Sequence, residues 1–317
     1  MGNKIYLDHA ATTYIKNEIL EEMYPYLKGN FGNASSIYRL GRKSKVAIEN
    51  SRGKVANALK CRTEEVFFTS GGTEADNWAI KGVALANRSK GNHIITSAIE
   101  HPAVINTCEF LKEDGFKITY LPVDEYGMIS LDQLKSSINK ETILISIMFA
   151  NNEVGTLQPI KDIGRIAKER DIYFHTDAVQ AIGNVPIAVN EYNIDLLSLS
   201  AHKIYGPKGI GALFVRNGTN VGTFLHGGSQ ERGRRSGTEN VASIVGLGKA
   251  VEVASKDIYN NNIRVKALRD RFVDEVLHKI PKARLNGHPV ERLTGNANIS
   301  FEFVKGKSLL SFLDDKG

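Results

Sequence analysis

Residues 197–213, LSLSAHKIYGPKGIGAL, place Lys203 in a setting suited to covalent chemistry. The apolar run 194–199 is typical of a buried strand, and a turn rich in glycine and proline follows the lysine at 206–211. A lysine held at a strand end by a stiff turn can lose water and charge, and its neutral amine can then attack a carbonyl carbon. The pattern therefore predicts a Schiff-base lysine. If the motif stood alone, a surface lysine in a polar loop would be the favoured alternative.

The segment 68–77, FTSGGTEADN, combines two glycines with the start of a helix. Thr73 is a good N-cap residue, and Asp76 three positions later completes a T-x-x-D capping box. The first turn of a helix has free N–H groups, and behind a glycine turn such a helix end binds anions. Structural capping alone would also explain the threonine. The segment predicts either an anion site or an ordinary capped helix.

Two further side chains of suitable chemistry stand at the ends of apolar runs. Asp177 closes the run in HTDAVQ, where a carboxylate could simply cap a following helix. His101 precedes Pro102 in SAIEHP, and this proline can occupy the first position of a helix. An imidazole has a flat face and a near-neutral pKa, but a lone histidine is more often structural. The function of both residues depends on what else lies at the same edge of the fold.

The elements that must position these residues are short β-type runs alternating with longer amphipathic ones. The expected strands are 65–69, 93–97, 116–121, 142–149, 172–177, 194–200 and 210–215. The expected helices include 73–88, 101–114, 130–139 and 160–170. Such alternation predicts an α/β fold with a mostly parallel seven-stranded sheet covered on both faces. In sheets of this kind ligands bind at the carboxyl ends of the strands.

From about residue 238 the pattern changes. A long helical stretch runs to about 279, with a bend expected at 259–262. Short strands at 283–287 and 298–303 and a last helix, through Leu309, Leu310 and Leu313, make a poor independent domain. The chain stops at Gly317, a residue type that usually follows a helix end and leads into another element. We therefore expect an incomplete small α+β domain.

Composition limits the class of protein. Of the 317 residues, 42% are hydrophobic and 24% are charged, and no apolar run is long enough to cross a bilayer. The two cysteines show neither metal-ligand spacing nor a disulfide framework, so we expect a cytoplasmic protein without a metal site. The net charge of +6 comes mostly from basic residues dispersed along helices, so no nucleic-acid or membrane partner is expected. A loop cluster of Arg232, Arg234 and Arg235 suits a phosphate, a carboxylate or an acidic surface.

Taken together, the motifs resemble the cysteine desulfurases, a branch of the class V aminotransferase-like enzymes that use pyridoxal 5′-phosphate (PLP). The matching strings are YLDHAATT at 6–13, FGNASSIY at 31–38, FTSGGTEADN at 68–77, IEHPAV at 99–104, NNEVGTLQPI at 151–160, HTDAVQAIG at 175–183, SAHKIYGPKGIGAL at 200–213 and GGSQERGRRSGTEN at 227–240. They follow the family's order and spacing over nearly the whole chain, which is far more specific than one glycine motif. The resemblance implies a PLP fold-type I large domain at 14–245 and a small domain formed by 1–13 and 246–317.

The resemblance also implies a role for each candidate residue. Lys203 would bind PLP covalently, and Asp177 would pair with the pyridine nitrogen so that the ring is a strong electron sink. His101 would stack over the ring and move protons, and Asn33 matches a position near the substrate. The remaining PLP contacts implied are Gly72, Thr73, Ser200, His202 and a partner-subunit Thr238 at the phosphate, with Asn152 and Gln180 near the phenolate oxygen.

The implied reaction converts L-cysteine to L-alanine and leaves the sulfur as a persulfide on an enzyme cysteine. In the family that cysteine, with a substrate-binding arginine, lies in a loop beyond the position of Gly317. Cys108 is expected to face the core, and Cys61 lies in a helix-to-strand turn that the family does not use, so neither is expected to be the nucleophile. We therefore expect a truncated chain that is inactive in sulfur transfer by itself.

Partners are implied in the same way: a second copy of the chain in a homodimer, and a sulfur-acceptor or scaffold protein serving iron–sulfur cluster or thio-cofactor synthesis. Two alternatives stay open. One is another class V PLP enzyme, either a selenocysteine lyase or an aminotransferase, which its reaction products would distinguish. The other is a non-catalytic PLP-fold scaffold, which would lack the visible absorbance of a lysine-bound cofactor. Tyr38 replaces a histidine that many members carry, which affects only local substrate contacts.

Overall fold

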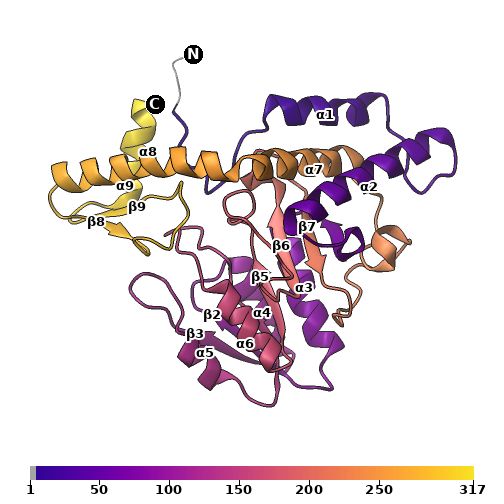
Figure 1. Ribbon diagram of the computed structural model, residues 1–317, viewed down its shortest axis with the longest axis horizontal. Coiled ribbons are helices and arrows are strands. Elements are labelled where there is room, and N and C mark those ends of the chain that lie inside the picture. The colour runs from indigo at the N-terminus through magenta and orange to yellow at the C-terminus, as the bar shows by residue number, and fades with distance from the viewer. Residues whose placement is uncertain (1–4) are drawn as a thin grey trace.

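The computed structural model describes residues 5–317; residues 1–4, which the sequence assigns to the small domain, lie outside the described residues. Within that range the main sheet has seven strands in the order β1-β7-β6-β5-β4-β2-β3 (Figure 1). The strands are β1 (Val66–Thr69), β2 (His93–Ser97), β3 (Lys117–Leu121), β4 (Thr142–Ser146), β5 (Tyr173–Asp177), β6 (Leu196–Ser200) and β7 (Gly211–Val215). Every expected strand forms, and the predicted α/β fold with a mostly parallel sheet is confirmed.

All strands of this sheet except β7 run in the same direction. β7 pairs antiparallel with both β1 and β6, so β1 and β6 run parallel although they are not neighbours. The remaining pairs, from β6 through β5, β4 and β2 to β3, are parallel. The carboxyl ends of β1, β2, β4, β5 and β6 therefore meet at one edge of the sheet, where ligands bind in folds of this type.

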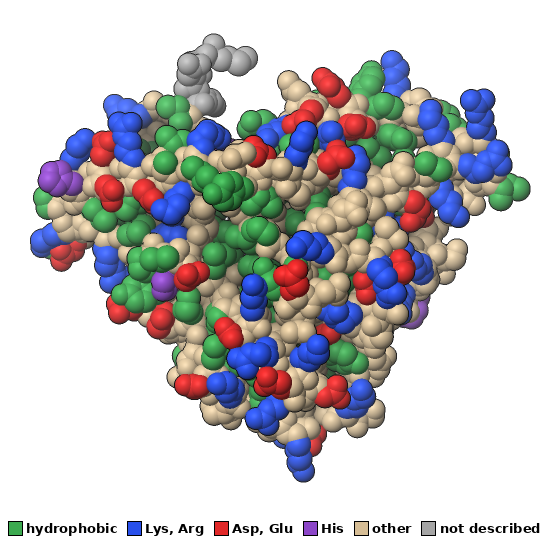
Figure 2. All heavy atoms as spheres, viewed as in Figure 1, with side chains coloured by type: hydrophobic (Ala, Val, Ile, Leu, Met, Phe, Trp, Pro, Cys, Tyr) green, Lys and Arg blue, Asp and Glu red, His purple; other side chains and the backbone are tan. Residues whose placement is uncertain are grey.

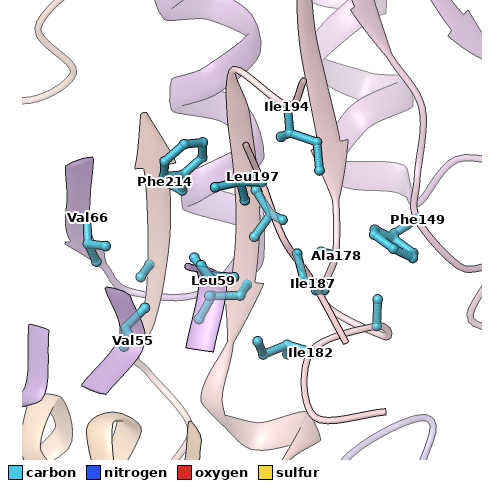
Figure 3. Packing of buried hydrophobic residues seen from close by; sticks show 14 of the residues in the cluster. Val55, Leu59, Val66, Phe149, Ala178, Ile182, Ile187, Ile194, Leu197 and Phe214 are labelled. Atoms are coloured by element: carbon cyan, nitrogen blue, oxygen red, sulfur yellow. The ribbon is translucent and has the colours of Figure 1, made fainter. Parts of the chain in front are cut away.

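Helices cover both faces of the sheet because successive side chains of each strand point to opposite sides. In β1, Phe67 packs with α3 (Gly72–Ala86) and α4 (Pro102–Glu113), whereas Val66 and Phe68 belong to the opposite core. That second core contains α2 (Arg39–Leu59), α5 (Leu131–Ser137), α6 (Ile160–Glu169) and α7 (Val241–Lys256). Figure 3 shows part of it, including Leu59 of α2 and the strand residues Leu197 and Phe214. The result is a sheet between two helical layers.

Helix α6 illustrates how the sequence pattern sets the packing. Ile160, Ile163, Ile166 and Ala167 recur at helical spacing and are all buried on the sheet. Lys168, between them and the helix end, is exposed. This is the face that the spacing predicts, because residues three and four apart lie on the same side of a helix.

The helical stretch after residue 238 forms two helices rather than one helix bent at 259–262. They are α7 and α8 (Ile258–Lys279), and they run end to end along the top of Figure 1. The break falls at Asp257, whose backbone (φ −138°, ψ 35°) is not helical. Its side chain accepts a hydrogen bond from Asn260 Nδ2 at 2.6 Å. Aspartate bonds to nearby groups in non-helical conformations, so it favours helix ends over helix interiors.

The two long helices differ in what they cover. α7 packs against α2 and against α1 (Asn17–Lys28), and its Leu247 and Ala250 are fully buried. α8 leads to a two-stranded antiparallel sheet of β8 (Ala283–Asn286) and β9 (Asn298–Phe301), followed by α9 (Gly306–Lys316). Each of the elements expected in this last part of the chain is present.

The surface carries charges of both signs. Figure 2 shows lysine and arginine side chains interspersed with aspartate and glutamate over the visible face, which is the dispersed arrangement that the sequence predicts. Among residues 5–317, the structure contains no helix with the length and apolar character needed to cross a membrane.

Candidate active site

Three strand ends come together at the carboxyl edge of the sheet. Asp177 is the last residue of β5, Ser200 is the last of β6, and Gly72 begins α3 just after β1. A Cβ atom added to Gly72 would lie 2.6 Å from Cγ2 of Val179 and 3.8 Å from Cβ of Ser200. Only glycine permits this close approach. The packing therefore brings the starts of the loops after β1, β5 and β6 into one place.

The start of α3 differs from the predicted capping box. Gly71 is the N-cap, with φ 156° and ψ −177°, a conformation that is essentially limited to glycine, and no side chain caps the helix. Thr73 therefore lies inside the first turn. Asp76 is a buried residue of the same helix, and its side chain does not bond to the helix start. The first amides of a helix have no partner within it, so this end can bind an anion through the backbone.

Lys203 lies in the short turn η2 (Ala201–Lys203) directly after β6. Its Nζ donates to the carbonyl oxygen of Ala11 at 2.8 Å and also to that of Ala10, which accepts a bond from Gln180 Nε2 at 3.0 Å. Burial lowers the pKa of Lys203, against the opposite effect of the Asp177 and Asp8 charges. A lower pKa increases the neutral fraction of the amine, which is the form that attacks a carbonyl. These contacts with backbone carbonyls could not be predicted from the sequence, because a residue of any type has a backbone carbonyl.

His202 is held by the same N-terminal segment. Its Nδ1 lies 3.1 Å from Oγ1 of Thr12, and its carbonyl oxygen accepts bonds from the amide and the hydroxyl of Thr13, both at 2.9 Å. Burial, assisted by the positive charges of Lys203 and Lys208, lowers the pKa of His202 to about 4. The ring is therefore neutral near pH 7 and can donate a hydrogen bond without adding charge.

Asp177 is a buried carboxylate within electrostatic reach of two basic groups. Its Oδ1 accepts a hydrogen bond from the Val179 amide at 2.9 Å, as the capping alternative implies, although the following residues form turns and no helix. Burial raises the pKa of Asp177, and the Val179 bond and the charges of His101 and Lys203 counter this. The ionised carboxylate of Asp177 could therefore pair with a positively charged ring bound next to it.

His101 is the N-cap of α4, and Pro102 is the first residue of that helix, as predicted. The Nδ1 atom of His101 accepts a hydrogen bond from the Ala103 amide at 3.1 Å. In the neutral imidazole only one ring nitrogen carries a proton, so this bond places that proton on Nε2. The exposed ring is thus fixed at one nitrogen and has a proton to donate at the other.

Beneath these residues lies a polar network of buried side chains that was not predicted from the sequence. His175 bonds to the hydroxyl oxygens of Ser146 and Ser198 at 2.8 and 3.0 Å, and its Nε2 is 3.6 Å from Oδ1 of Asp76. Burial lowers the pKa of His175 to about 3. The position of His175 near the site could have been predicted, because His175 and Asp177 are two positions apart on β5 and therefore point to the same side of the sheet.

A second buried acid, Glu100, belongs to the same region. Its Oε1 accepts hydrogen bonds from the Ser97 hydroxyl at 2.6 Å and the Met148 amide at 2.9 Å. Burial raises the pKa of Glu100 to about 8, helped slightly by the negative charge of Asp177. Glu100 is therefore protonated over much of the neutral range.

Three of the predicted site residues make no described hydrogen bond to the residues at the carboxyl edge of the sheet. Asn33 is exposed, and its Oδ1 accepts from the Ser35 amide at 2.9 Å in a local turn. Asn152 is half-buried, and it is the neighbouring Asn151 whose Oδ1 accepts hydrogen bonds from the loop amides of Glu153 and Val154. Thr238 is exposed in the loop 227–240. Among residues 5–317, no hydrogen bond links these three side chains to Gly72, Asp177 or Lys203.

The three arginines of the loop 227–240 all make contacts within the chain. Arg235 pairs with Glu74 of α3, with Nε 2.7 Å from Oε1. Arg232 donates to the carbonyl oxygens of Val66 and Thr63 at 3.3 Å, and Arg234 lies over the ring of Phe67. Within one chain, Arg235 thus binds a carboxylate, one of the groups that the cluster was expected to suit, whereas Arg232 and Arg234 both lie over the ring of Phe67.

The two cysteines occupy positions unsuited to nucleophilic chemistry. Cys108 is fully buried in α4, as predicted, and Cys61 is half-buried in the turn after α2. Burial, reinforced by neighbouring carboxylates, raises the pKa of each thiol to about 12. Since the thiolate is the reactive form, neither cysteine is activated near neutral pH.

Comparison with known proteins identifies the family. The model of the aminotransferase class-V family matches residues 5–317. A protein named cysteine desulfurase IscS from Methanosarcina thermophila is 60% identical over 313 residues, covering 99% of this chain and 77% of that protein. This chain belongs to the cysteine desulfurase family. Another cysteine desulfurase IscS, from Clostridium botulinum, is 54% identical over 319 residues, covering 100% of this chain and 80% of that protein.

Solved structures resemble this desulfurase closely. A NifS-like protein superimposes with a TM-score of 0.96 at 38% identity, covering 99% of this chain and 86% of that one. The structure titled SspA in complex with cysteine has a TM-score of 0.88 at 39% identity, covering 98% and 87%. These likenesses confirm the predicted family, fold and enzyme class, a sulfurtransferase, and the family implies that the desulfurase uses PLP.

The desulfurase site fits PLP in three respects. The amine of Lys203 has a lowered pKa and suits an aldehyde. The start of α3 offers unpaired amides to a phosphate. The buried carboxylate of Asp177 suits a protonated pyridine nitrogen. The start of α3 follows β1, Lys203 follows β6 and Asp177 ends β5, so all three features lie at the carboxyl edge of the sheet.

Proposed function

We propose that this desulfurase removes sulfur from L-cysteine and leaves L-alanine, with PLP held where the loops after β1, β5 and β6 meet. One observation carries the proposal. The half-buried amine of Lys203 lies within electrostatic reach of the buried Asp177 carboxylate, and Gly72 at the start of α3 packs against the same loops. An aldehyde, a pyridine nitrogen and a phosphate would each meet a complementary group.

In the proposed arrangement, different strand ends bind different parts of the cofactor. The phosphate would bind at the start of α3 and at the end of β6, and the pyridine nitrogen would face Asp177. The groups proposed to hold PLP are Gly72, Thr73, Asn152, Asp177, Gln180, Ser200, His202 and Lys203, with Thr238 contributed across the dimer. Asn33 is proposed to contact the substrate.

When bound, PLP supplies an electron sink for negative charge at the substrate Cα. Lys203 would hold the carbonyl carbon of the cofactor, and its amine, when free, would accept the Cα proton of the substrate. The lowered pKa of Lys203 favours the unprotonated form that this step needs. His101, whose Nδ1 is engaged by the Ala103 amide, is proposed to donate and recover a proton at Nε2.

The sulfur is proposed to pass to a thiol other than Cys61 and Cys108. Both thiols have pKa values near 12, so neither supplies a thiolate at neutral pH. From that acceptor thiol the sulfur would move to an acceptor or scaffold protein for iron–sulfur cluster or thio-cofactor synthesis. This chemistry is proposed to take place in the cytoplasm, where free thiols stay reduced.

We also propose a homodimer in which both sites are equivalent by two-fold symmetry. The loop 227–240 is largely exposed, and Thr238 on it has no described bond to its own chain's site. A loop that reaches the neighbour's phosphate would couple cofactor affinity to association. Sedimentation of apo and PLP-loaded protein tests this: a monomer that binds PLP tightly would contradict it.

The division into domains is part of the proposal: a large domain at 14–245 and a small domain formed by 1–13 and 246–317. Residues 246–256 complete α7, which packs on α1 and α2. Limited proteolysis of the folded chain would locate the boundary, since cleavage concentrates in exposed connections between domains.

Reduction of the PLP-loaded protein with borohydride, followed by peptide mapping, tests the site directly. The pyridoxyl mass should appear on the peptide that contains Lys203, and a label on another lysine would refute the assignment. Product analysis tests the reaction. Alanine and sulfide from L-cysteine support it when an acceptor thiol is supplied, whereas keto acids from other amino acids would indicate an aminotransferase instead.

A further inference from the structure

An ion pair links the loop 227–240 to the first turn of α3. Nε of Arg235 lies 2.7 Å from Oε1 of Glu74, and one terminal guanidinium nitrogen lies 3.2 Å from Oε2, so the contact is two-pointed. The two side chains are 21% and 13% exposed, which shields the pair from solvent. Glu74 follows Thr73 directly and thus stands in the turn proposed to hold the cofactor phosphate.

Glu74 also holds the glycine turn that precedes the helix. Its Oε2 accepts bonds from the amide of Ser70 at 3.1 Å and from the Ser70 hydroxyl at 2.5 Å. Burial opposes ionisation, but the bonds from Arg235 and Ser70 outweigh it and lower the pKa of Glu74. The side chain is therefore negatively charged at neutral pH. Without a counter-charge, this carboxylate would repel an anion at the same helix end.

We propose that Arg235 balances the charge of Glu74 and thereby permits the cofactor phosphate to bind at the start of α3. The inference rests on the proposed function, because it takes the phosphate to lie at this helix end. It gives the loop a positioning role within its own chain, in addition to the contact of Thr238 across the dimer.

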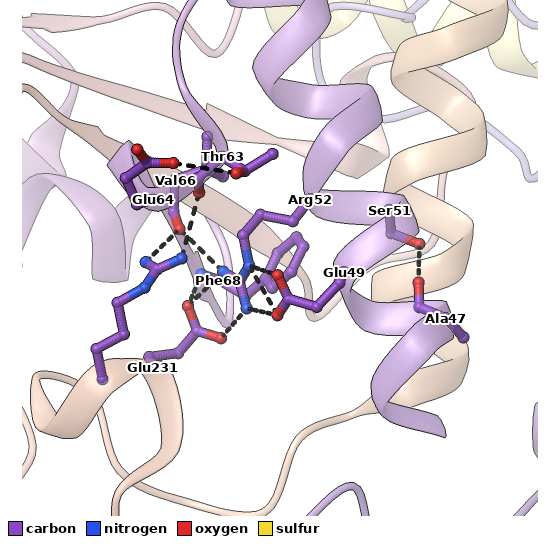
Figure 4. Close-up of polar contacts among 10 residues, drawn as sticks. Ala47, Glu49, Ser51, Arg52, Thr63, Glu64, Val66, Phe68 and Glu231 are labelled. Carbon is purple, nitrogen blue, oxygen red and sulfur yellow. Dashed lines mark hydrogen bonds and ion pairs between the residues drawn. The ribbon is translucent and has the colours of Figure 1, made fainter. Parts of the chain in front are cut away.

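A second, buried ion pair keeps Arg235 in reach of Glu74. Glu231, at the start of the loop's sharp turn, accepts two hydrogen bonds from the Arg52 guanidinium of α2, at 2.8 and 2.9 Å (Figure 4). Its Oε2 also accepts a hydrogen bond from the Phe68 amide of β1 at 2.9 Å. Glu231 and Arg232 have φ angles of 44° and 58°, in the left-handed region that favours glycine. Non-glycine residues stay in this region only when surrounding contacts hold them there. The loop, β1 and the start of α3 are thus tied together.

The test compares PLP with pyridoxal, which lacks the phosphate, by titrating the cofactor-free dimer and following the visible absorbance. Arg235→Gln should weaken PLP binding about tenfold, and pyridoxal binding by less than about twofold. Adding Glu74→Gln to that variant should restore PLP affinity to within about threefold of the wild type, because the uncompensated charge is gone. Arg234→Gln, which removes a charge of the same loop that does not touch Glu74, is the matched control and should leave both affinities unchanged.

Each other outcome is decisive. Equal weakening of PLP and pyridoxal, or no recovery in the double variant, would show that the ion pair only maintains the fold and would overturn the inference. If Arg235→Gln fails to fold, Glu74→Gln alone decides, since the inference requires PLP binding that is equal or tighter. A wild-type protein that binds neither compound at Lys203 would overturn the proposed function and the inference with it, whereas normal wild-type binding with an unaffected Arg235→Gln would overturn only the inference.

Discussion

The guanidinium of Arg52 and the carboxylate of Glu231 form a buried two-point ion pair, although 179 positions separate them in the chain. Their side chains are only 5% and 4% exposed. The Arg52 group also donates to the carbonyl of Val66 and lies over the ring of Phe68. The pair therefore joins α2, the edge strand β1 and the turn η3 (Gln230–Gly233) of the loop 227–240.

Breaking this pair should cost far more than breaking an exposed one. Arg52→Met should lower the free energy of unfolding by about 3–5 kcal/mol, because it leaves Glu231 buried without a counter-charge. The double variant Arg52→Met/Glu231→Leu should lose less than this single variant. Lys54→Met is the control, since the side chains of its pair with Glu252 are 32% and 42% exposed and the pair should contribute about 1 kcal/mol or less. Urea denaturation of the cofactor-free protein measures both, and equal losses would contradict the prediction.

Gly72→Ala should disturb the cofactor site through a single contact. Its Cβ would lie 2.6 Å from Cγ2 of Val179, a stiff β-branched side chain, so the start of α3 or the loop after β5 must shift. We expect PLP affinity to fall at least about tenfold, and to recover when Val179→Ala is added.

Gly53→Ala is the matched control for that change. Gly53 lies inside α2, and an added Cβ there meets nothing within 4 Å. Stability should rise by up to about 1 kcal/mol, since alanine favours helix over glycine, while PLP binding stays the same. A titration in which Gly72→Ala binds PLP like the wild type would show that the close approach is not needed.

Glu100 should make the stability of the cofactor-free protein depend on pH. Its pKa is raised from 4.5 to about 8 by burial, so between these values the folded protein keeps a proton that the unfolded chain releases. This contribution is fully present below pH 4.5 and is lost as the pH rises through 8, an effect on the order of a few kcal/mol. Glu100→Gln, which is neutral at every pH, should remove that fall.

Chemical denaturation at several pH values between 5 and 9 would measure this difference. Glu113→Gln, an exposed change on the neighbouring helix α4, should leave the pH profile as it is. His175 acts in the opposite direction: burial lowers its pKa from 6.5 to about 3, so its contribution is lost as the pH falls below 6.5. A Glu100→Gln protein whose stability falls from pH 5 to 8 as steeply as that of the wild type would show that Glu100 is ionised in the fold.

Cys61 and Cys108 should react slowly with iodoacetamide in the folded protein. Both pKa values lie near 12, so at pH 7.5 the thiolate fraction is far below that of an ordinary cysteine. Mass spectrometry over time should show little alkylation until urea is added, after which both thiols should react. Rapid alkylation of Cys61, or sulfide production that disappears in Cys61→Ala or Cys108→Ala, would show that one of them is a functional nucleophile.

The local sequence determined which segments became strands and helices and which residues stand at their ends. Strand β5 ends at Asp177, Pro102 begins α4, and Cys108 faces the core, all as predicted. These features depend on side-chain periodicity and on turn chemistry, which act over a few neighbouring residues. The family, likewise, was evident from motifs in a fixed order.

Tertiary structure decided which distant groups meet and how deeply they are buried. Local pattern made Thr73 a helix cap, but Gly71 takes that position because a glycine conformation fits the close packing of the turn on Gly211. Arg235 and Glu74 lie 161 positions apart, and their pairing depends on the path of the whole loop. The protonated state of Glu100 and the neutral state of His175 come from burial, which arises only when the sheet and its helices close over them.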